Sequence, residues 1–211
     1  MEREELKQLV KQVVLEYMDQ QVTQIPIGVS GRHLHLSEKD FKTLFPGEDL
    51  RVMRWLKQPG EFAAEQTVTV VGKKGQIERV RILGPFRTET QLEISKTDAR
   101  KIGIPAVIRM SGELLGTPGV MLLTDAGEVD LQQGVIVAKR HIHMPTSVAE
   151  CLQVAAGEEV SVQVRSGERS LIFQHCVVRV SDDFELEMHI DIDEANAADV
   201  GEDAFATIVE I

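Results

Sequence analysis

The sequence predicts a mainly β fold, in which two related small β-barrel domains arise from an internal duplication, with short helices and an N-terminal amphipathic helix. Three observations predict this fold class. After an N-terminal segment with a helical pattern, the same series of short strands with alternating apolar and polar residues occurs twice along the chain. Turn signals recur roughly every ten residues, as in closed or nearly closed barrels. The length of 211 residues suits one large domain or two small ones.

The N-terminal segment, residues 1–22, predicts an amphipathic helix. Its apolar residues recur at the i, i+3, i+4, i+7 spacing of one helix face, and they are Leu6, Leu9, Val10, Val13, Val14 and Tyr17. This stripe can pack against the body of the protein, against a second copy in a homo-oligomer, or against an external partner. The stretch from Gln21 to Pro26 then ends the helix.

Two repeats follow, over residues 25–110 and 135–211, with a connector over 111–134 whose turns allow it to donate strands to either repeat. The repeats open with IGVSGRHLHLSEKDF and VIVAKRHIHMPTSVAE, each predicting a strand that ends in Arg-His-x-His, a Ser or Thr N-cap and a short helix. A hairpin comes next in each (TVTVVGKKGQIERVRIL and VSVQVRSGERSLIFQHCVVRV). Each closes with a strand and a short helix (TQLEISKTDARKIGI and LEMHIDIDEANAADVGE). A cleft between duplicated halves is the expected ligand site.

Composition is that of an ordinary globular protein, with 43% hydrophobic and 27% charged residues. The charged N-terminus and the short apolar runs predict neither a signal peptide nor a membrane span, so we expect a cytoplasmic protein with no membrane partner. The two cysteines, Cys151 and Cys176, are not spaced as CxxC. They exclude a thiolate zinc cluster, argue against a disulfide, and are expected to be buried.

The charge is unevenly distributed in this acidic chain. The net charge of -11 argues against nucleic acid as a partner. Residues 51–110 nevertheless carry 12 Lys and Arg against 6 Asp and Glu, while residues 111–211 carry 5 against 19. This basic stretch favours a small polyanionic ligand, the alternative being a solvated basic face.

Four of the six histidines form two His-x-His pairs at matching places in the repeats, His33/His35 and His141/His143. Residues two apart on a strand share a face, so both imidazoles of a pair can reach one ion. The closing strands offer a third ligand on the same period, Gln91 or Glu93 in the first repeat and His189 or Asp191 in the second. The simplest assignment is one site of His33, His35 and Glu93 and another of His141, His143 and His189. Three such ligands with an open position are typical of catalytic zinc.

Arginine is the second recurrent residue near these histidines. Arg32 and Arg140 precede the two His pairs, and Arg87 follows the Gly84-Pro85 turn signal, six residues before Glu93. The guanidinium fork suits phosphate, so a metal with an arginine nearby indicates a site for phosphoryl or carboxylate oxygens. The alternative for Arg87 is a surface arginine at a strand end. His175 lies apart in the second hairpin and is expected to be structural, without a partner.

Long motifs in this chain are similar to those of a known family: GVSGRHLHLS, KQPGEFAAEQTVTVVG, RILGPFRTETQLEISKTDARKIGI, RMSGELLGTPG and AKRHIHM. Over about residues 25 to 211 the chain resembles the PduL-type phosphate propanoyltransferases, the acyl-CoA phosphotransacylases associated with bacterial microcompartments. The resemblance implies two β-barrel domains and a pair of zinc ions (Zn2+) in the cleft. It implies a reaction that interconverts acyl-CoA plus phosphate with acyl phosphate plus coenzyme A. The acyl-CoA substrate it implies is propanoyl-CoA or acetyl-CoA.

The resemblance also implies roles for individual residues. The two zinc ligand sets agree with the spacing argument. The phosphate contact falls on Arg87, with Ser111 beside it. Coenzyme A contacts fall on Val29, Ser30, Gly31, Lys74, Arg81 and Asn196. One coenzyme A lysine of the family is replaced near Arg54. The association with microcompartments implies that the N-terminal helix binds a shell or cargo protein.

Two other classes of protein share some of these features. A cupin-like metal-dependent dioxygenase or isomerase also uses His-x-His, Glu and a distant His in a β-barrel, but here Glu150 lies seven residues beyond His143 rather than four or five. A non-catalytic metal-binding scaffold protein is the other alternative. Neither cysteine lies in a matched motif and no Ser-His-Asp pattern is visible, so an acyl-enzyme is not expected.

Overall fold

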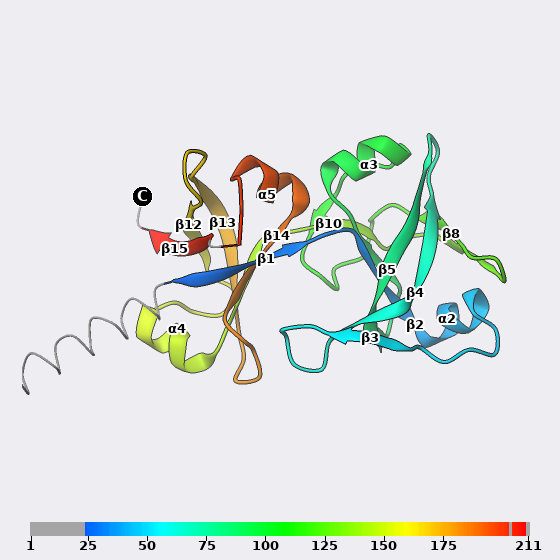
Figure 1. Ribbon diagram of the computed structural model, residues 1–211, viewed down its shortest axis with the longest axis horizontal. Helices are drawn as coiled ribbons and strands as arrows, with labels where there is room; N and C mark the ends of the chain where they lie inside the picture. Colours follow the sequence, from blue (N-terminus) through cyan, green and yellow to red (C-terminus); the bar gives the residue numbers. More distant parts are fainter. Residues whose placement is uncertain (1–23, 203, 210–211) are drawn as a thin grey trace, which may run out of the picture. The chain divides into compact units, whose positions relative to one another are not determined.

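The computed structural model describes residues 24–202 and 204–209 and is mainly β (Figure 1). The predicted mainly β fold class is confirmed, whereas the helix predicted over residues 1–22 lies outside the described residues. The described helices are α2 (Glu38–Leu44), α3 (Lys96–Ile102), α4 (Thr146–Leu152) and α5 (Ile192–Ala197). The strands are β1 (Ile25–Ser30), β2 (His33–Ser37), β3 (Val52–Trp55), β4 (Phe62–Val71), β5 (Gln76–Arg87), β6 (Gln91–Glu93), β7 (Ile108–Arg109), β8 (Val120–Leu123), β9 (Glu128–Leu131), β10 (Val135–Ala138), β11 (His141–Met144), β12 (Glu159–Arg165), β13 (Leu171–Val180), β14 (Glu187–Asp191) and β15 (Phe205–Val209).

The chain forms two compact units that exchange short segments. The barrel unit comprises His141–His189, the chain from Ala197 onward and the segment that ends at Gly28. The sheet unit comprises Val29–Arg140 and Ile190–Asn196. Each unit therefore contains most of one sequence repeat and a segment from beyond it.

The barrel unit closes in the strand order β1-β14-β11-β13-β12-β15. Apolar and polar residues alternate along the barrel strands, as a barrel with an apolar interior requires. On β12, for example, Val160, Val162 and Val164 are buried while their neighbours are partly or fully exposed. The β1–β15 pairing, with Ile25 opposite Ala206, brings the two ends of this sheet together. A closed sheet leaves no unpaired edge.

The sheet unit contains a nine-stranded sheet, a half-barrel with the path β7-β10-β6-β2-β5-β4-β8-β9 and β3 paired to β4. The connector contributes β8 and β9 to this sheet, through the pairing of β8 with β4. Strands β4 and β5 form its long hairpin (Figure 1). One apolar cluster under α2 and α3 forms the core, and its fully buried members include Leu34, Leu36, Leu44, Val70, Ile82, Leu92 and Ile102.

The same three-strand arrangement surrounds each histidine pair. In the sheet unit β2 lies between β5, which is parallel, and β6, which is antiparallel. In the barrel unit β11 lies between β13, which is parallel, and β14, which is antiparallel. The duplication in the sequence is therefore also a duplication of sheet topology around the histidines.

A matching bulge marks both copies. Arg79 on β5 and His175 on β13 have φ angles of 57°. Each lies two residues before the residue that pairs with the first histidine, Arg81 or Val177. The register of the neighbouring hairpin shifts beside each of them, as at a β-bulge. His175 therefore occupies a bulge position, and its Nδ1 lies 2.8 Å from Oε2 of Glu159, which corrects the expectation that it has no partner.

Helix caps follow the sequence in one repeat and depart from it in the other. Ser37 caps α2 and Ser95 caps α3, each accepting a hydrogen bond from the backbone N–H three residues on. The second repeat differs from the expectation of a Ser or Thr cap, because Pro145 is the N-cap of α4 and makes no side-chain cap bond. Proline has no side-chain acceptor to cap the helix, and Thr146, which follows it, is the first residue of the helix rather than its N-cap.

Both cysteines are free, but only Cys176 is buried as expected, whereas Cys151 on α4 is exposed.

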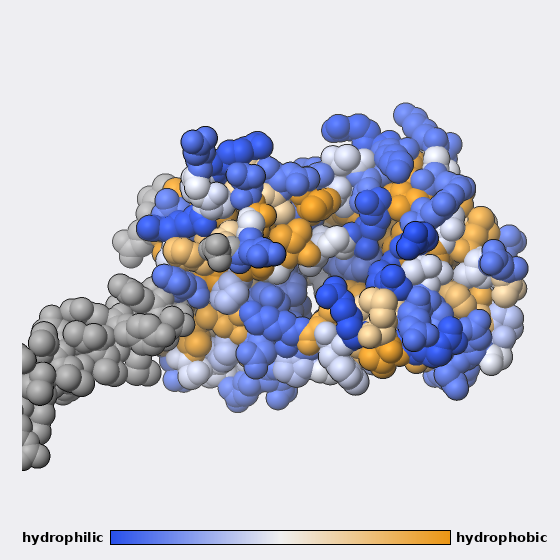
Figure 2. All heavy atoms as spheres, in the orientation of Figure 1, coloured by the Kyte–Doolittle hydropathy of each residue, from blue (hydrophilic) through white to orange (hydrophobic). Residues whose placement is uncertain are grey.

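Hydrophilic side chains are spread over the face shown in Figure 2, with smaller apolar patches between them. Among the described residues, no helix combines the length and the apolar character needed to cross a membrane.

Candidate functional site

The first histidine cluster is assembled by the pairing of β2 with β6. His33 lies directly opposite Glu93 and His35 opposite Gln91. The Nε2 atom of His33 is 3.5 Å from Oε2 of Glu93, and Nε2 of His35 is 3.9 Å from Oε1. Within the described part of the chain, these side chains form a group whose three donor atoms lie within 4.8 Å of one another. All three are buried. The donor set matches a catalytic metal site.

Burial and hydrogen bonding keep this cluster in the form that binds metals. Nδ1 of His33 lies 2.8 Å from the carbonyl oxygen of Gly31, which can only accept, so Nδ1 carries the proton and Nε2 presents its lone pair. Burial, assisted by the charges of His33 and Arg87, lowers the pKa of His35 to about 3. The His35 ring can therefore act as a neutral ligand at neutral pH.

Arg87 and Ser111 lie beside this cluster and contact each other. Nη1 of Arg87 donates to Oγ of Ser111 at 2.8 Å, and this hydroxyl donates to Oε1 of Glu93 at 3.1 Å. Gln91 supports the arrangement from β6. Its Nε2 donates to Glu93 Oε1 at 2.6 Å and to Ser111 Oγ at 2.8 Å, and its Oε1 accepts from the backbone N–H of Gly112 at 2.7 Å. The structure thus brings both predicted phosphate residues next to a predicted metal ligand.

The second histidine cluster has the same origin in the barrel unit. His141 lies opposite His189 on the β11–β14 pair. The three ring centroids of His141, His143 and His189 are 4.7 to 5.1 Å apart. Burial first, and then the charges of His141, His189 and Arg179, lower the pKa of His143 to about 2. Nδ1 of His143 is buried with no hydrogen-bond partner. The three rings therefore lie beside one another, although among the described residues only the first cluster brings its donor atoms within 4.8 Å of one another.

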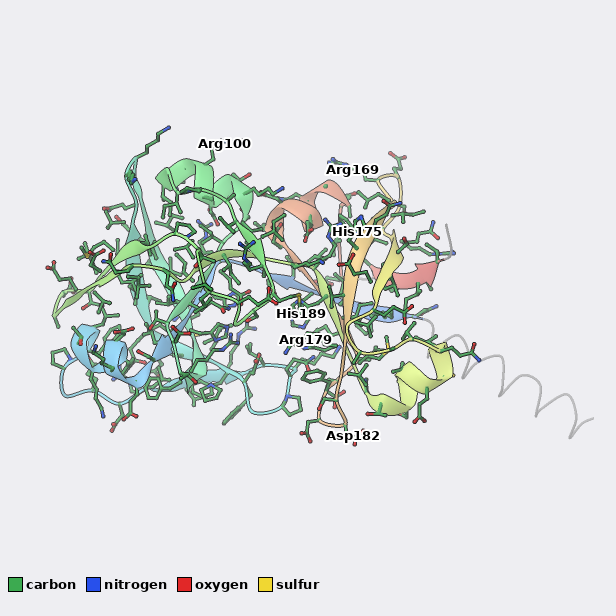
Figure 3. All side chains as sticks on the ribbon, turned by 180° about the vertical axis from the view of Figure 1, so that it is seen from behind. Arg100, Arg169, His175, Arg179, Asp182 and His189 are labelled. Atoms are coloured by element: carbon green, nitrogen blue, oxygen red, sulfur yellow. The ribbon has the colours of Figure 1, made fainter. Side chains whose placement is uncertain are left out.

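Two charged side chains border this second cluster. Nη1 of Arg179 lies 3.1 Å from Nε2 of His143, and Oε2 of Glu187 lies 2.9 Å from Nε2 of His189. Figure 3 labels Arg179 and His189, which come from β13 and β14, the strands on either side of β11. Phe184 also stacks on the His143 ring at 4.4 Å.

Sequence reasoning offered Gln91 only as an alternative third ligand, and it missed Arg179 and Glu187 as parts of the site. Glu187 lies two residues before His189 on the same strand face, so the period-two argument that found Gln91 could also have found Glu187. Arg179 has no such signal, because its position beside His143 depends on the parallel pairing of β11 with β13.

The residues expected to contact coenzyme A all belong to the sheet unit, namely Val29, Ser30, Gly31, Lys74, Arg81 and Asn196. The structure places them at separate positions. The backbone N–H of Lys74 bonds the Ile102 carbonyl at the C-terminal end of α3. Asn196 lies on α5, whose Asp193 accepts from the backbone N–H of Thr97 at the other end of α3. Arg81 pairs with His33, and its guanidinium donates to the carbonyls of Ala64 and Glu65.

Comparison with known proteins identifies the class. The family model described as phosphate propanoyltransferase matches residues 26–201. A phosphate propanoyltransferase of Citrobacter koseri is 52% identical over 205 residues, covering 96% of this chain and 98% of that protein. A phosphate propanoyltransferase of Salmonella typhimurium is likewise 52% identical over 205 residues, with the same coverage. A phosphate propanoyltransferase of Levilactobacillus brevis is 50% identical over 210 residues and covers both chains fully.

The fold, the site and these matches define an acyltransferase that uses phosphate. More particularly, the chain belongs to the phosphate propanoyltransferase family. The cupin-like and scaffold alternatives are therefore set aside.

Proposed function

We propose that this chain transfers the acyl group of a short acyl-CoA, propanoyl-CoA or acetyl-CoA, to inorganic phosphate and releases coenzyme A, with the help of two bound zinc ions. The observation that carries this proposal is the hydrogen-bonded chain from Arg87 through Ser111 to Glu93, beside His33 and His35. An arginine fork and a metal-ligand set in contact suit a phosphate anion.

The residues of both clusters fit zinc. His33, His35 and Glu93 supply two imidazoles and a carboxylate whose donor atoms lie within 4.8 Å of one another. His141, His143 and His189 supply three imidazoles with ring centroids 4.7 to 5.1 Å apart, including a buried nitrogen that lacks a partner. Both sets match the ligands of catalytic zinc. When bound, zinc supplies positive charge that polarises a carbonyl or offsets phosphate charge. Zinc held by the first set would replace the contacts that now join the histidines to Glu93.

The protein residues orient phosphate and remove its water. Hydrated phosphate is a poor nucleophile, so it must be held and partly desolvated near the thioester carbon. Arg87 would bind two phosphate oxygens with its fork, while Ser111, held by Gln91, would fix the orientation of the guanidinium. A phosphate oxygen then bonds to the acyl carbon, the carbon–sulfur bond breaks, and coenzyme A leaves with the electron pair. Neither cysteine enters this scheme.

Coenzyme A would bind to the sheet unit. Its phosphates suit the basic side chains of Lys74 and Arg81, and its polar groups suit Ser30 and exposed Asn196. Val29 and Gly31 flank Ser30 at the end of β1. The support is the local surplus of positive charge over residues 51–110.

The apolar stripe of residues 1–22 and the association of the family with bacterial microcompartments support a targeting helix that binds a shell or cargo protein. The enzyme would then act inside a microcompartment of the cytoplasm.

The test is release of coenzyme A from acetyl-, propanoyl- and butanoyl-CoA in the presence of phosphate, with zinc-loaded and chelator-treated protein. We expect phosphate-dependent release with the short chains and its loss after chelation. Release that is independent of phosphate, or unaffected by complete metal removal, would contradict the proposal.

A further inference from the structure

An arginine precedes each histidine pair, and each of these arginines forms an ion pair with a carboxylate. Nη1 of Arg32 lies 3.1 Å from Oδ1 of Asp98, and Nε of Arg140 lies 2.8 Å from Oε1 of Glu194. Asp98 is five residues after Glu93, and Glu194 is five residues after His189. The two pairs therefore occupy equivalent positions in the repeats.

The ion pairs lie where the ligand-bearing strands meet their neighbours. Arg32 immediately precedes β2 and Asp98 follows β6, the antiparallel partner of β2. Arg140 immediately precedes β11, and Glu194 follows β14, its antiparallel partner. Because the strands are antiparallel, each ion pair joins them at the end that carries the first histidine and the third ligand. The ion pair thus restrains the relative position of those two ligands.

The carboxylates are held by the first turn of a short helix. The Glu194 backbone N–H donates to Oδ1 of Asp191 at 2.9 Å, and the Asp191 N–H donates to Oε2 of Glu194 at 3.1 Å, which is a reciprocal capping box. Ser95 and Asp98 occupy the equivalent places on α3, and the Asp98 N–H donates to Ser95 Oγ. Aspartate is one methylene shorter than glutamate, and its Oδ2 is buried without a partner. The other oxygen of Asp98, Oδ1, accepts a hydrogen bond from Nη1 of Arg32 at 3.1 Å.

The first ion pair acts on a ligand through the backbone. Gly31, next to Arg32, provides the carbonyl that accepts from Nδ1 of His33. Anchoring Arg32 to Asp98, whose side chain is only 9% exposed, fixes this carbonyl. The carbonyl in turn holds His33 in the tautomer that leaves Nε2 unprotonated.

A hydrogen bond joins the two helices that carry the carboxylates. Oδ2 of Asp193 on α5 accepts from the backbone N–H of Thr97 on α3 at 2.9 Å. Thr97 and Asp193 are the immediate neighbours of Asp98 and Glu194. All these residues belong to the sheet unit.

We infer that Arg32–Asp98 and Arg140–Glu194 are two copies of one positioning device, which holds each His-x-His pair in the orientation that binds metal. The inference rests on the proposed zinc sites. It assigns a role to four residues that touch neither phosphate nor coenzyme A in the proposed reaction.

The first test measures zinc affinity at one site at a time. In a His141→Ala background only the first site can titrate, and in a His33→Ala background only the second. We expect Asp98→Asn to weaken zinc binding about 10- to 100-fold in the first background, and Glu194→Gln to do so in the second, as loss of residues that orient metal ligands commonly does. Affinity comes from competition with a chelating indicator, using the full chain.

Arg51→Gln is the matched control, because Arg51 forms ion pairs with Glu48 and Glu65 in the same unit away from the histidines. It should leave both affinities unchanged. If Asp98→Asn does not fold, Arg32→Gln replaces it, since the Arg32 side chain is 44% exposed. Unchanged zinc affinity in Asp98→Asn and Glu194→Gln, or an equal loss in Arg51→Gln, overturns the inference.

The second test needs no metal. Nitrogen-15 spectra of the imidazoles in metal-free protein at pH 8 distinguish the two tautomers, and His33 is assigned by its loss in His33→Asn. We expect His33 protonated at Nδ1 in the wild type and a mixture of tautomers in Asp98→Asn. An unchanged tautomer overturns the positioning role of Asp98. If wild-type protein binds no zinc, the proposed zinc site fails, yet a tautomer change in Asp98→Asn still supports the positioning role.

Discussion

Arg87 donates a hydrogen bond to the hydroxyl of Ser111 at 2.8 Å, and that hydroxyl donates its own hydrogen bond to Glu93 at 3.1 Å. Ser111 can do both because a hydroxyl has one donor and two acceptor positions, and the second acceptor position is filled by Gln91. The candidate phosphate residue and the candidate metal ligand are therefore fixed by one fully satisfied side chain. This relationship sets the first expectation.

Substitution of Arg87 should impair the use of phosphate. The loss of a charge-assisted contact from Arg87→Ala costs about 3 kcal/mol, or about a hundredfold, if the site excludes water. We expect a large rise in the KM for phosphate or a fall in kcat, with little change in coenzyme A affinity. Steady-state kinetics with each substrate varied in turn measures this. If Arg87→Ala showed the phosphate kinetics of the wild type, Arg87 would be a surface residue without a role in phosphate binding.

Each histidine cluster should bind one metal ion independently of the other cluster. We expect elemental analysis of zinc-loaded protein to give two ions per chain, and His141→Ala to give one. The fold should survive, because the first cluster and the core of the sheet unit lie in a unit that does not contain His141. A wild-type content of at most one ion after careful loading would contradict the assignment of two sites.

The period-two pattern made much of the site predictable. His33, His35 and Glu93 lie at alternate positions of two strands, so their shared face followed from sequence alone. The repeat also indicated that the second copy would be built in the same way, and His141 and His189 do lie opposite each other. Duplication and strand geometry are local signals, so a single sequence carries them.

Contacts made through long-range pairing were not predictable in this way. Arg179 reaches His143 only because β13 runs parallel to β11, and parallel register has no signal in the sequence between the strands. The exchange of short segments between the two units is equally hidden, since Ile190–Asn196 continues the chain of one unit yet belongs to the other.

Gly134 should be required for the start of β6. Its φ angle is 122°, and a Cβ atom there would lie 2.5 Å from the Thr90 carbonyl oxygen, next to Gln91. Gly134→Ala should therefore lower the free energy of unfolding by about 1–3 kcal/mol and reduce activity by displacing Gln91. Urea denaturation and phosphate kinetics measure the two effects.

The control is Gly47→Ala, because Gly47 also has a positive φ, 79°, but a Cβ atom there meets nothing within 4 Å. Gly47→Ala should lower the free energy of unfolding only by the cost of placing alanine at a positive φ, and its phosphate kinetics should be normal. Equal kinetic defects in both variants would show that the close approach to Thr90 is not what positions Gln91.

The N-terminal segment gives the last prediction. Its apolar stripe, Leu6, Leu9, Val10, Val13, Val14 and Tyr17, is too apolar for a helix that stands alone in water, and a helix of about 20 residues is marginal without packing. If the stripe binds a shell or cargo protein, deletion of residues 1–20 should leave activity, Tm and oligomeric state unchanged while co-localisation with shell proteins is lost. Fluorescence microscopy of tagged chains, together with calorimetry and size-exclusion chromatography, measures these properties. A deletion that instead aggregates, dissociates or lowers Tm by several degrees, about 1 kcal/mol or more in stability, would show that the helix packs within the protein and would end the targeting proposal.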